Sequence, residues 1–151
     1  MSLSRRAFIE RLWQVIVAAG AAPFFTFEEL LAAPAQANRP KVVWLHGTSC
    51  SGCSTAFLDI EQLPVTEILT QILDLVYHPD ISLATGEQAL AILDHMADAE
   101  EGFILVLEGG IPVGMPHACV MGERPMMEWV ERLARRAGML IAAGTCAALG
   151  G

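Results

Sequence analysis

The chain has 151 residues, of which 54% are hydrophobic, with a formal net charge of -8 and four cysteines. This length suits one domain, and the apolar content predicts a packed core rather than a disordered chain. The whole acidic excess follows residue 37, where only six basic residues occur. Such a chain matches nucleic acid poorly, because affinity for nucleic acid depends on neutralising phosphates, so we exclude nucleic acid as a partner.

Residues 1–37 have the pattern of an export signal. Arg5 and Arg6 precede an uncharged, mostly apolar stretch over 12–27, and small residues at 35–37 resemble a cleavage site. Paired arginines indicate the twin-arginine route. We therefore expect a signal peptide over 1–37, recognised by the twin-arginine export machinery, and one exported domain over 38–151. The alternative is an N-terminal helix that belongs to the fold; a retained membrane anchor fits less well, because the apolar stretch is short.

Four apolar segments predict β-strands in the remaining chain, over 41–46, 73–78, 103–107 and 139–143. Apolar residues at helical spacing predict helices between them, over 63–73, 86–99 and 124–138. We expect the last helix to bury Met127, Val130, Leu133 and Ala134. Apolar strands that alternate with helices are typical of an α/β fold. The sequence therefore predicts a doubly wound parallel sheet with helices on both faces.

The cysteines follow three of the predicted strands. Cys50 and Cys53 come after the first strand, Cys119 after the third and Cys146 after the fourth. Ligand sites of open parallel sheets lie at the carboxyl ends of the strands. We therefore expect all four thiols at one edge of the sheet.

Four cysteines at one edge are compatible with several kinds of site. An exported protein can form disulfides, and Cys50-x-x-Cys53 also resembles a redox pair of the thioredoxin type. We expect no helix directly after Cys53, and further cysteines share its edge, which both count against the redox pair.

The same four cysteines could instead bind a metal. Zinc needs four Cys or His ligands, and the histidines available to complete such a set are His46, His78 and His117. An iron–sulfur cluster needs soft thiolates, and backbone N–H groups would approach its sulfides at Gly47, Gly52 and Gly144. Cysteine spacing by itself leaves zinc and iron–sulfur equally open.

Three segments carry a resemblance to a known family. They are His-Gly-Thr-Ser-Cys-Ser-Gly-Cys-Ser over 46–54, Leu-Glu-Gly-Gly-Ile-Pro over 107–112 and Ala-Gly-Thr-Cys-Ala-Ala-Leu-Gly-Gly over 143–151. In this order they resemble successive signatures of the small, electron-transfer subunit of nickel–iron hydrogenases. The resemblance covers essentially the whole chain, and the paired arginines are similar to those of periplasmic members.

The resemblance implies a flavodoxin-like domain that holds the proximal [4Fe-4S] cluster beside the nickel–iron centre of the large subunit. Position by position, three cluster ligands match Cys50, Cys53 and Cys146, whereas Cys119 matches a cysteine that does not bind the cluster. The fourth ligand and the further clusters belong to later segments of the family, which implies that the domain is incomplete at its C-terminus. Other cofactor-binding residues expected within the motifs are Gly47, Gly52, Glu108, Gly144 and Thr145.

The function that the resemblance implies is electron transfer in a periplasmic hydrogenase. The large subunit would be the partner in a heterodimer and would carry out the hydrogen chemistry, so this chain would contain no catalytic residue. A membrane redox partner would receive the electrons. One alternative is a cluster-binding subunit of a respiratory complex, although those relatives have adjacent cysteines where this chain has Cys50-x-x-Cys53. Another is an exported, non-catalytic domain stabilised by zinc or disulfides.

Two further polar residues end predicted strands. We expect Glu108 to hydrogen-bond the cysteine loop or the partner subunit, with a solvated carboxylate as the alternative. His78 is expected to be a capping or packing residue rather than a ligand.

Overall fold

The computed structural model describes residues 39–100 and 102–150. Its centre is a four-stranded parallel sheet in the order β2-β1-β3-β6. The strands are β1 Lys41–His46, β2 Asp74–Tyr77, β3 Ile104–Glu108 and β6 Met139–Ala143. The predicted doubly wound, flavodoxin-like α/β fold is confirmed. The predicted signal peptide over 1–37 lies outside the described residues.

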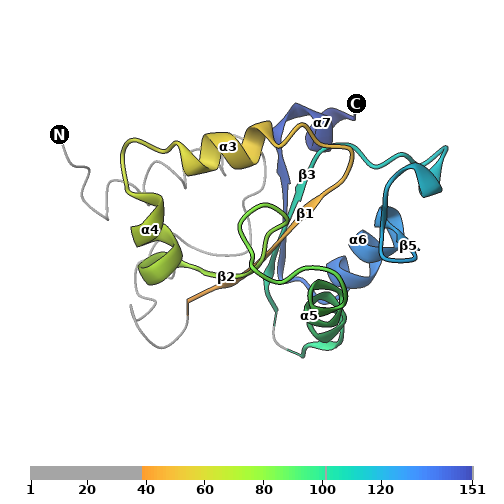
Figure 1. Cartoon of the computed structure of the whole chain (residues 1–151), viewed down its shortest axis with the longest axis horizontal. Helices are drawn as coiled ribbons and strands as arrows, with labels where there is room; N and C mark the ends of the chain where they lie inside the picture. Colours follow the sequence, from red (N-terminus) through yellow and green to blue (C-terminus); the bar gives the residue numbers. More distant parts are fainter. Residues whose placement is uncertain (1–38, 101, 151) are drawn as a thin grey trace.

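Helices connect the strands along the chain (Figure 1). Between β1 and β2 lie α3 Gly52–Leu58, α4 Val65–Glu67 and the π-helix η1 Ile68–Ile72. Between β2 and β3 lies α5 Glu87–Asp98. Between β3 and β6 lie the 3-10 helix η2 Pro116–Ala118, the antiparallel strands β4 Val120–Met121 and β5 Arg124–Pro125, and α6 Met126–Ala134. The last helix is α7 Gly144–Leu149. Within the described ranges, none of the helices has both the length and the apolar character needed to cross a bilayer.

The larger core lies on the face of the sheet that α5 and α6 cover (Figure 1). Val43 of β1 and Leu105 of β3 pack there in one cluster with Leu93 of α5 and Leu133 of α6, and all four side chains are fully buried. Burying a side chain of this size stabilises the fold by about 1.5–3 kcal/mol. This face therefore anchors β1 and β3 against the two helices.

The opposite face is covered by α3. Val42, Trp44 and Val106 are buried there, and Phe57 of α3 packs against them with its ring centroid 5.6 Å from that of Trp44. Successive side chains of a strand point to opposite faces, which is why Val43 belongs to the other core. The indole of Trp44 consequently lies on the side of the sheet from which α3 approaches.

The helices differ from the sequence prediction in three respects. α3 begins at Gly52, within the segment where no helix was predicted. The predicted helix over 63–73 is divided into α4 and η1. In α6 the buried residues are Met126, Trp129 and Leu133, whereas Ala134 is exposed. The buried face of α6 is therefore rotated relative to the predicted one. Trp129 lies on this face because its indole N–H donates to the carbonyl of Met121 at 3.0 Å, which fixes the ring against the segment before the helix.

The register of the strands brings three loops to one edge. His46 is paired with Glu108, and Glu108 is paired with Ala143, so β1, β3 and β6 end at the same level. From β1 the chain crosses to β2 on one side, and from β2 it returns to β3 on the other. Sheets of this kind bind ligands where the connections diverge in this way. The fold therefore places the loops after β1, β3 and β6 where a site is expected.

Candidate metal centre

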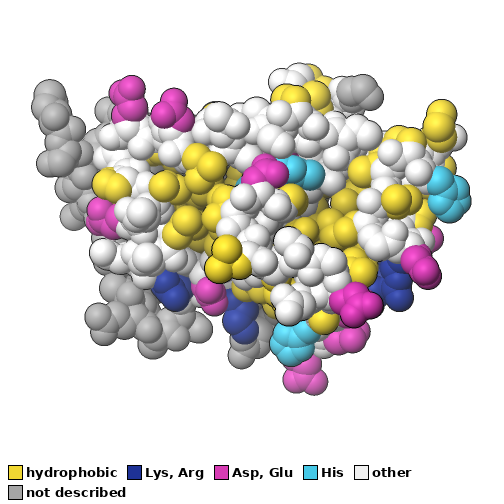
Figure 2. Space-filling model, in the orientation of Figure 1, with side chains coloured by type: hydrophobic (Ala, Val, Ile, Leu, Met, Phe, Trp, Pro, Cys, Tyr) yellow, Lys and Arg dark blue, Asp and Glu magenta, His cyan; other side chains and the backbone are white. Residues whose placement is uncertain are grey.

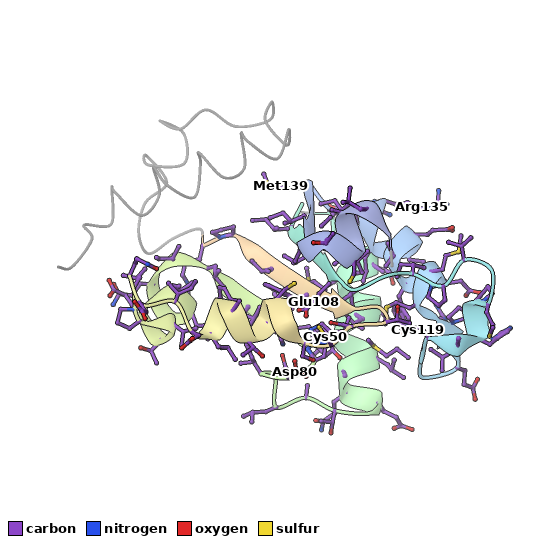
Figure 3. The ribbon with its side chains drawn as sticks, turned by 90° about the horizontal axis from the view of Figure 1, so that it is seen from above. Cys50, Asp80, Glu108, Cys119, Arg135 and Met139 are labelled. Carbon is purple, nitrogen blue, oxygen red and sulfur yellow. The ribbon has the colours of Figure 1, made fainter. Side chains whose placement is uncertain are left out.

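Three cysteine side chains line one pocket at this edge of the sheet. Cys50 comes from the loop before α3, Cys53 from the first turn of α3 and Cys146 from the first turn of α7, around a volume of about 40 Å³. All three are free thiols. Figure 3 shows Cys50 and Glu108 at this end of the sheet, away from Met139, where β6 begins. The other lining residues are Ser49, Glu108, Gly109, Ala143 and Thr145.

Neither Cys119 nor a histidine lines this pocket. Cys119 follows η2, where its partly buried side chain packs against the core on the face of α5 and α6. His117 belongs to η2, and His46 and His78 are hydrogen-bonded to Ser54. A zinc set completed by histidine is therefore absent from the pocket. The donor set there consists of thiols, which suit iron–sulfur clusters as well as zinc.

The chain turns sharply between the first two cysteines. Ser51 has φ 58 and ψ 15, a left-handed conformation that is costly for a residue with a side chain. A Cβ atom at the next residue, Gly52, would lie 3.1 Å from the Cys50 Sγ. The turn leads directly into α3, so Cys53 lies in the first turn of a helix. A helix after the Cys50-x-x-Cys53 motif is compatible with a redox pair of the thioredoxin type, so the predicted lack of a helix no longer argues against that pair. The presence of a third thiol in the pocket, that of Cys146, still argues against it.

Gly144 allows β6 to end against Cys53. It has φ 80, and a Cβ atom there would overlap the Cys53 Sγ. The thiol also lies 3.5 Å from the carbonyl oxygen of Ala143, to which it donates. Gly47, in contrast, lies outside the pocket lining, and its N–H donates to the carbonyl of Glu108 at 2.7 Å. Gly47 thus joins two loops and does not present its N–H to the pocket.

Comparison with known proteins identifies the family. The model of the family described as "NADH ubiquinone oxidoreductase, 20 Kd subunit" matches residues 50–151, a range that includes the three cysteines of the pocket. The chain belongs to this family.

Curated relatives within the family are hydrogenase small subunits. The periplasmic [NiFeSe] hydrogenase small subunit of Desulfomicrobium baculatum is 32% identical over 100% of this chain and 52% of its own length. The periplasmic [NiFe] hydrogenase small subunit of Solidesulfovibrio fructosivorans is 35% identical over 99% of this chain and 48% of its own length. The predicted resemblance is confirmed: the chain is a homologue of hydrogenase small subunits and spans about half the length of these relatives.

The fold leads to the same family. A solved structure of the [NiFeSe] hydrogenase of Desulfomicrobium baculatum matches with a TM-score of 0.71 at 34% identity, over 76% of this chain and 46% of that chain. The family model is described by the name of a respiratory subunit, whereas the curated relatives and the solved structure are hydrogenases.

In this small-subunit homologue, Glu108 lies directly beneath the cysteine loop. Its side chain is only 1% exposed, which excludes the solvated alternative. Its Oε1 accepts hydrogen bonds from the Ser49 hydroxyl at 2.8 Å and the Cys53 N–H at 3.1 Å, and its Oε2 accepts from the Ser54 N–H at 3.0 Å. The indole N–H of Trp44 also donates to Oε2, at 3.2 Å. One carboxylate thus ties β1, β3 and the cysteine loop together.

Glu108 also takes the place of a helix N-cap. Ser51, at the N-cap position of α3, makes no side-chain cap hydrogen bond. The N–H groups of Cys53 and Ser54 belong to the first turn, which has no partners within the helix, and the carboxylate accepts from both. The start of α3 therefore depends on a residue of β3, far away in sequence.

Two imidazoles complete the surroundings of this carboxylate. The Ser54 Oγ lies 2.5 Å from the Glu108 Oε2, 2.9 Å from the His46 Nε2 and 3.0 Å from the His78 Nε2. The His78 Nδ1 accepts from the N–H of Asp80 at 3.0 Å. His78 is fully buried, as its predicted packing role requires, and it also hydrogen-bonds Ser54 and Asp80. Sequence analysis missed Ser54, because nothing in the motif distinguishes its hydroxyl from those of its serine neighbours.

The pKa values show which of these groups carry charge. Burial raises the pKa of Glu108, but hydrogen bonds from Ser54 and Ser49, together with the nearby His46, outweigh burial and leave the pKa below its usual value. Burial and the neighbouring His46 lower the pKa of His78. At neutral pH, Glu108 is therefore an ionised carboxylate and His78 a neutral imidazole.

The pKa of the Cys53 thiol is raised, whereas the pKa values of Glu108 and His78 are lowered. Burial raises its pKa, and the negative charges of Glu108, Cys50 and Cys146 add to this effect. A thiol in this position stays protonated until a cation offsets the surrounding negative charge, because metal coordination deprotonates a thiol. A thiolate at Cys53 is therefore favoured only when a metal binds its sulfur.

Proposed function

We propose that the chain is the electron-transfer small subunit of a periplasmic nickel–iron hydrogenase and that it holds a [4Fe-4S] cluster through Cys50, Cys53 and Cys146. The observation that carries the proposal is the meeting of these three free thiols in one pocket, within the segment that matches the family. When bound, such a cluster supplies one-electron transfer. The hydrogen chemistry itself belongs, under this proposal, to the nickel–iron centre of a large subunit.

The residues present fit such a cluster in kind. Three soft thiols supply three of its four ligands, and no histidine interrupts the pocket lining. Cys53 and Cys146 lie in the first turns of α3 and α7, so two helices bring their thiols to the same pocket. The fourth position requires a ligand that the described residues do not bring to this pocket.

Each remaining residue of the site has a role under this proposal. Gly52 and Gly144 leave room beside two of the sulfurs, and Thr145 and Gly109 form the wall of the pocket. Glu108 holds the cysteine loop from below and adds a fixed negative charge. Negative charge close to a cluster lowers its potential, and N–H donors raise it, so the loop and Glu108 together set the potential at which electrons pass.

A large subunit is the partner that this site requires. Cys50 and Cys146 are exposed, so a cluster bound there would face solvent unless another protein covered it. Apolar side chains are exposed in the loop after β3 and on α7, where Val113 is 65%, Met115 is 68% and Leu149 is 82% accessible. Figure 2 shows hydrophobic side chains in several patches on one face of the molecule, with polar and charged side chains between them. Permanent complexes bury apolar surfaces of this kind.

The sequence pattern and the names of two relatives support export. We infer a twin-arginine signal peptide over 1–37, since a cluster inserted before export requires a route for folded proteins. Two of the relatives are named periplasmic. Electrons would then leave through a membrane redox partner, which also supplies any membrane association.

The test is anaerobic co-expression of the full chain with a hydrogenase large subunit from the same source. Iron and acid-labile sulfide would be measured on the purified chain, with electron paramagnetic resonance after reduction. We expect a reduced-cluster signal on a complex that contains both proteins. A chain purified under these conditions without iron, sulfide and partner would contradict the proposal.

A further inference from the structure

The hydroxyl of Ser54 is at the centre of the buried polar network, and its side chain is 1% exposed. Its Oγ has three polar neighbours, which are the Glu108 Oε2 and the Nε2 atoms of His46 and His78. A hydroxyl has one proton to donate and two lone pairs. The three contacts therefore use its whole hydrogen-bonding capacity.

The positions of the protons follow from these contacts. The Glu108 Oε2 already accepts from the N–H groups of Trp44 and Ser54, so it acts as an acceptor and the Ser54 hydroxyl donates to it. The Nε2 atoms of both imidazoles must then carry a proton. The Nε2–H of His78 donates to the Ser54 Oγ, and the Nε2 of His46 lies within reach of two acceptors, the Ser54 Oγ at 2.9 Å and the Glu108 Oε2 at 3.2 Å. For His78 a second contact requires the same tautomer, because its Nδ1 accepts from the Asp80 N–H and the proton must lie on Nε2.

The tautomer of His78 with its proton on Nε2 argues against a cation site formed by His46, His78 and Asp80. Ligand atoms of His46, His78 and Asp80 lie within 4.8 Å of one another. The His78 Nε2 carries the proton that points at Ser54 and its Nδ1 accepts from the Asp80 N–H, so neither nitrogen of this ring is free to bind a metal. Every buried side-chain nitrogen and oxygen in the described part of the chain has a hydrogen-bond partner, so the network needs no ion to complete it.

We propose that Ser54 is a positioning residue, which gathers the N–H donors of His46 and His78 and holds the carboxylate of Glu108 in one orientation beneath the cysteine pocket. The positive end of its O–H dipole faces the carboxylate and offsets part of that charge. The orientation also aligns the carboxylate with the N–H groups of Trp44 and Cys53. The effect on a bound cluster rests on the proposed function, whereas the effect on Glu108 does not.

The first experiment uses the full chain without iron. Long-range proton–nitrogen NMR of the histidines reads the tautomers in the unchanged protein, so it needs no variant. We expect a proton on Nε2 of His78. A proton on Nδ1 of that residue would overturn the proposed network.

Hydrogen exchange in variants then tests the positioning. In Ser54→Ala we expect the Trp44 indole N–H and the Cys53 amide to exchange about tenfold faster, because the carboxylate that accepts from both is released. Ser54→Thr retains the hydroxyl and should restore slow exchange. The matched control is Thr55→Ala, which removes an exposed hydroxyl bonded only to the Ser51 carbonyl. Exchange at Trp44 that is the same in Ser54→Ala and in the control would show that Ser54 positions nothing.

A second experiment uses the loaded complex. With iron content equal to that of the unchanged protein, Ser54→Ala should shift the midpoint potential of the cluster downwards, because the carboxylate charge is less offset. An unchanged potential would refute this effect on the cluster. If no cluster assembles even in the unchanged protein, the proposed function fails, while tautomers and exchange rates still decide the role of Ser54.

Discussion

Glu108 accepts a hydrogen bond from the backbone N–H of Cys53 at 3.1 Å, so the end of β3 and the start of α3 share one buried carboxylate. Fifty-five positions separate the two residues along the chain. The geometry of a cysteine in the pocket consequently depends on a side chain from another strand, and Glu108 links the stability of the fold to the site.

Removing this carboxylate should destabilise the protein strongly. In Glu108→Ala the buried donors of Trp44 and Ser54 and the partly buried hydroxyl of Ser49 lose their acceptor, which should lower the free energy of unfolding by about 3–5 kcal/mol. Glu108→Gln retains one oxygen and should cost less. Urea unfolding of the iron-free chain measures both. The control is Glu123→Ala at an exposed position; an equal loss in that variant would show that the Glu108 network contributes nothing.

Acid should weaken the fold in two steps. The pKa of His78 is lowered from 6.5, so below that pH the unfolded chain binds a proton that the folded chain resists, and the free energy of unfolding falls. The pKa of Glu108 is lowered from 4.5, so its contribution is present above that pH and is lost as the pH falls further. Unfolding free energies measured from pH 8 to 4 should therefore decline first below about 6.5.

The first step can be assigned with two histidine variants. His78→Gln should flatten the decline below pH 6.5, whereas His95→Gln, at an exposed position on α5, should leave it unchanged. An identical pH profile in the two variants would exclude His78 as its origin.

The cysteines should separate into ligands and a packing residue. Cys50→Ser and Cys146→Ser each remove a thiol from the pocket, so iron content and visible absorption should be lost. Cys119→Ser changes a side chain that packs against the core, so iron should be retained. Iron analysis of the anaerobically purified complex distinguishes them. Retained iron in Cys50→Ser, or lost iron in Cys119→Ser, would overturn the ligand set.

A methyl group at Gly144 should damage the pocket without removing a ligand. It would overlap the Cys53 Sγ and place a side chain on a residue with φ 80. We expect Gly144→Ala to lose about 1–2 kcal/mol of unfolding free energy from the backbone conformation, and iron loading to fall as well. Gly114→Ala is the matched control, since a Cβ atom there would meet nothing within 4 Å. Equal iron content in both variants would contradict the steric role of Gly144.

The positions of the strands and the edge that carries three of the cysteines could be predicted from the sequence. Apolar segments such as 103–107 are recognisable because a strand buried on both faces needs continuous apolar side chains. Parallel strands then place their following loops at one edge, which correctly joined Cys50, Cys53 and Cys146. The strand positions follow from the local apolar pattern, and the shared edge follows from the parallel direction of the strands. Both can be read from the sequence.

The start of α3 and the place of the Cys119 side chain were decided only by tertiary structure, although the family resemblance already predicted that Cys119 is not a cluster ligand. The segment after Cys50 has no local helix signal, and its helix begins because a carboxylate from β3 caps it. Cys119 follows β3 in the chain, but η2 lies between them and β4 begins directly after Cys119, whose side chain packs against the core. Likewise, Glu108 is buried among donors from β1, α3 and the loop before α3. Contacts between residues distant in sequence determine the start of α3 and the place of Cys119, which no local pattern of residues encodes. For Glu108 the same kind of contact selects, among the expected alternatives, the hydrogen bonds to the cysteine loop.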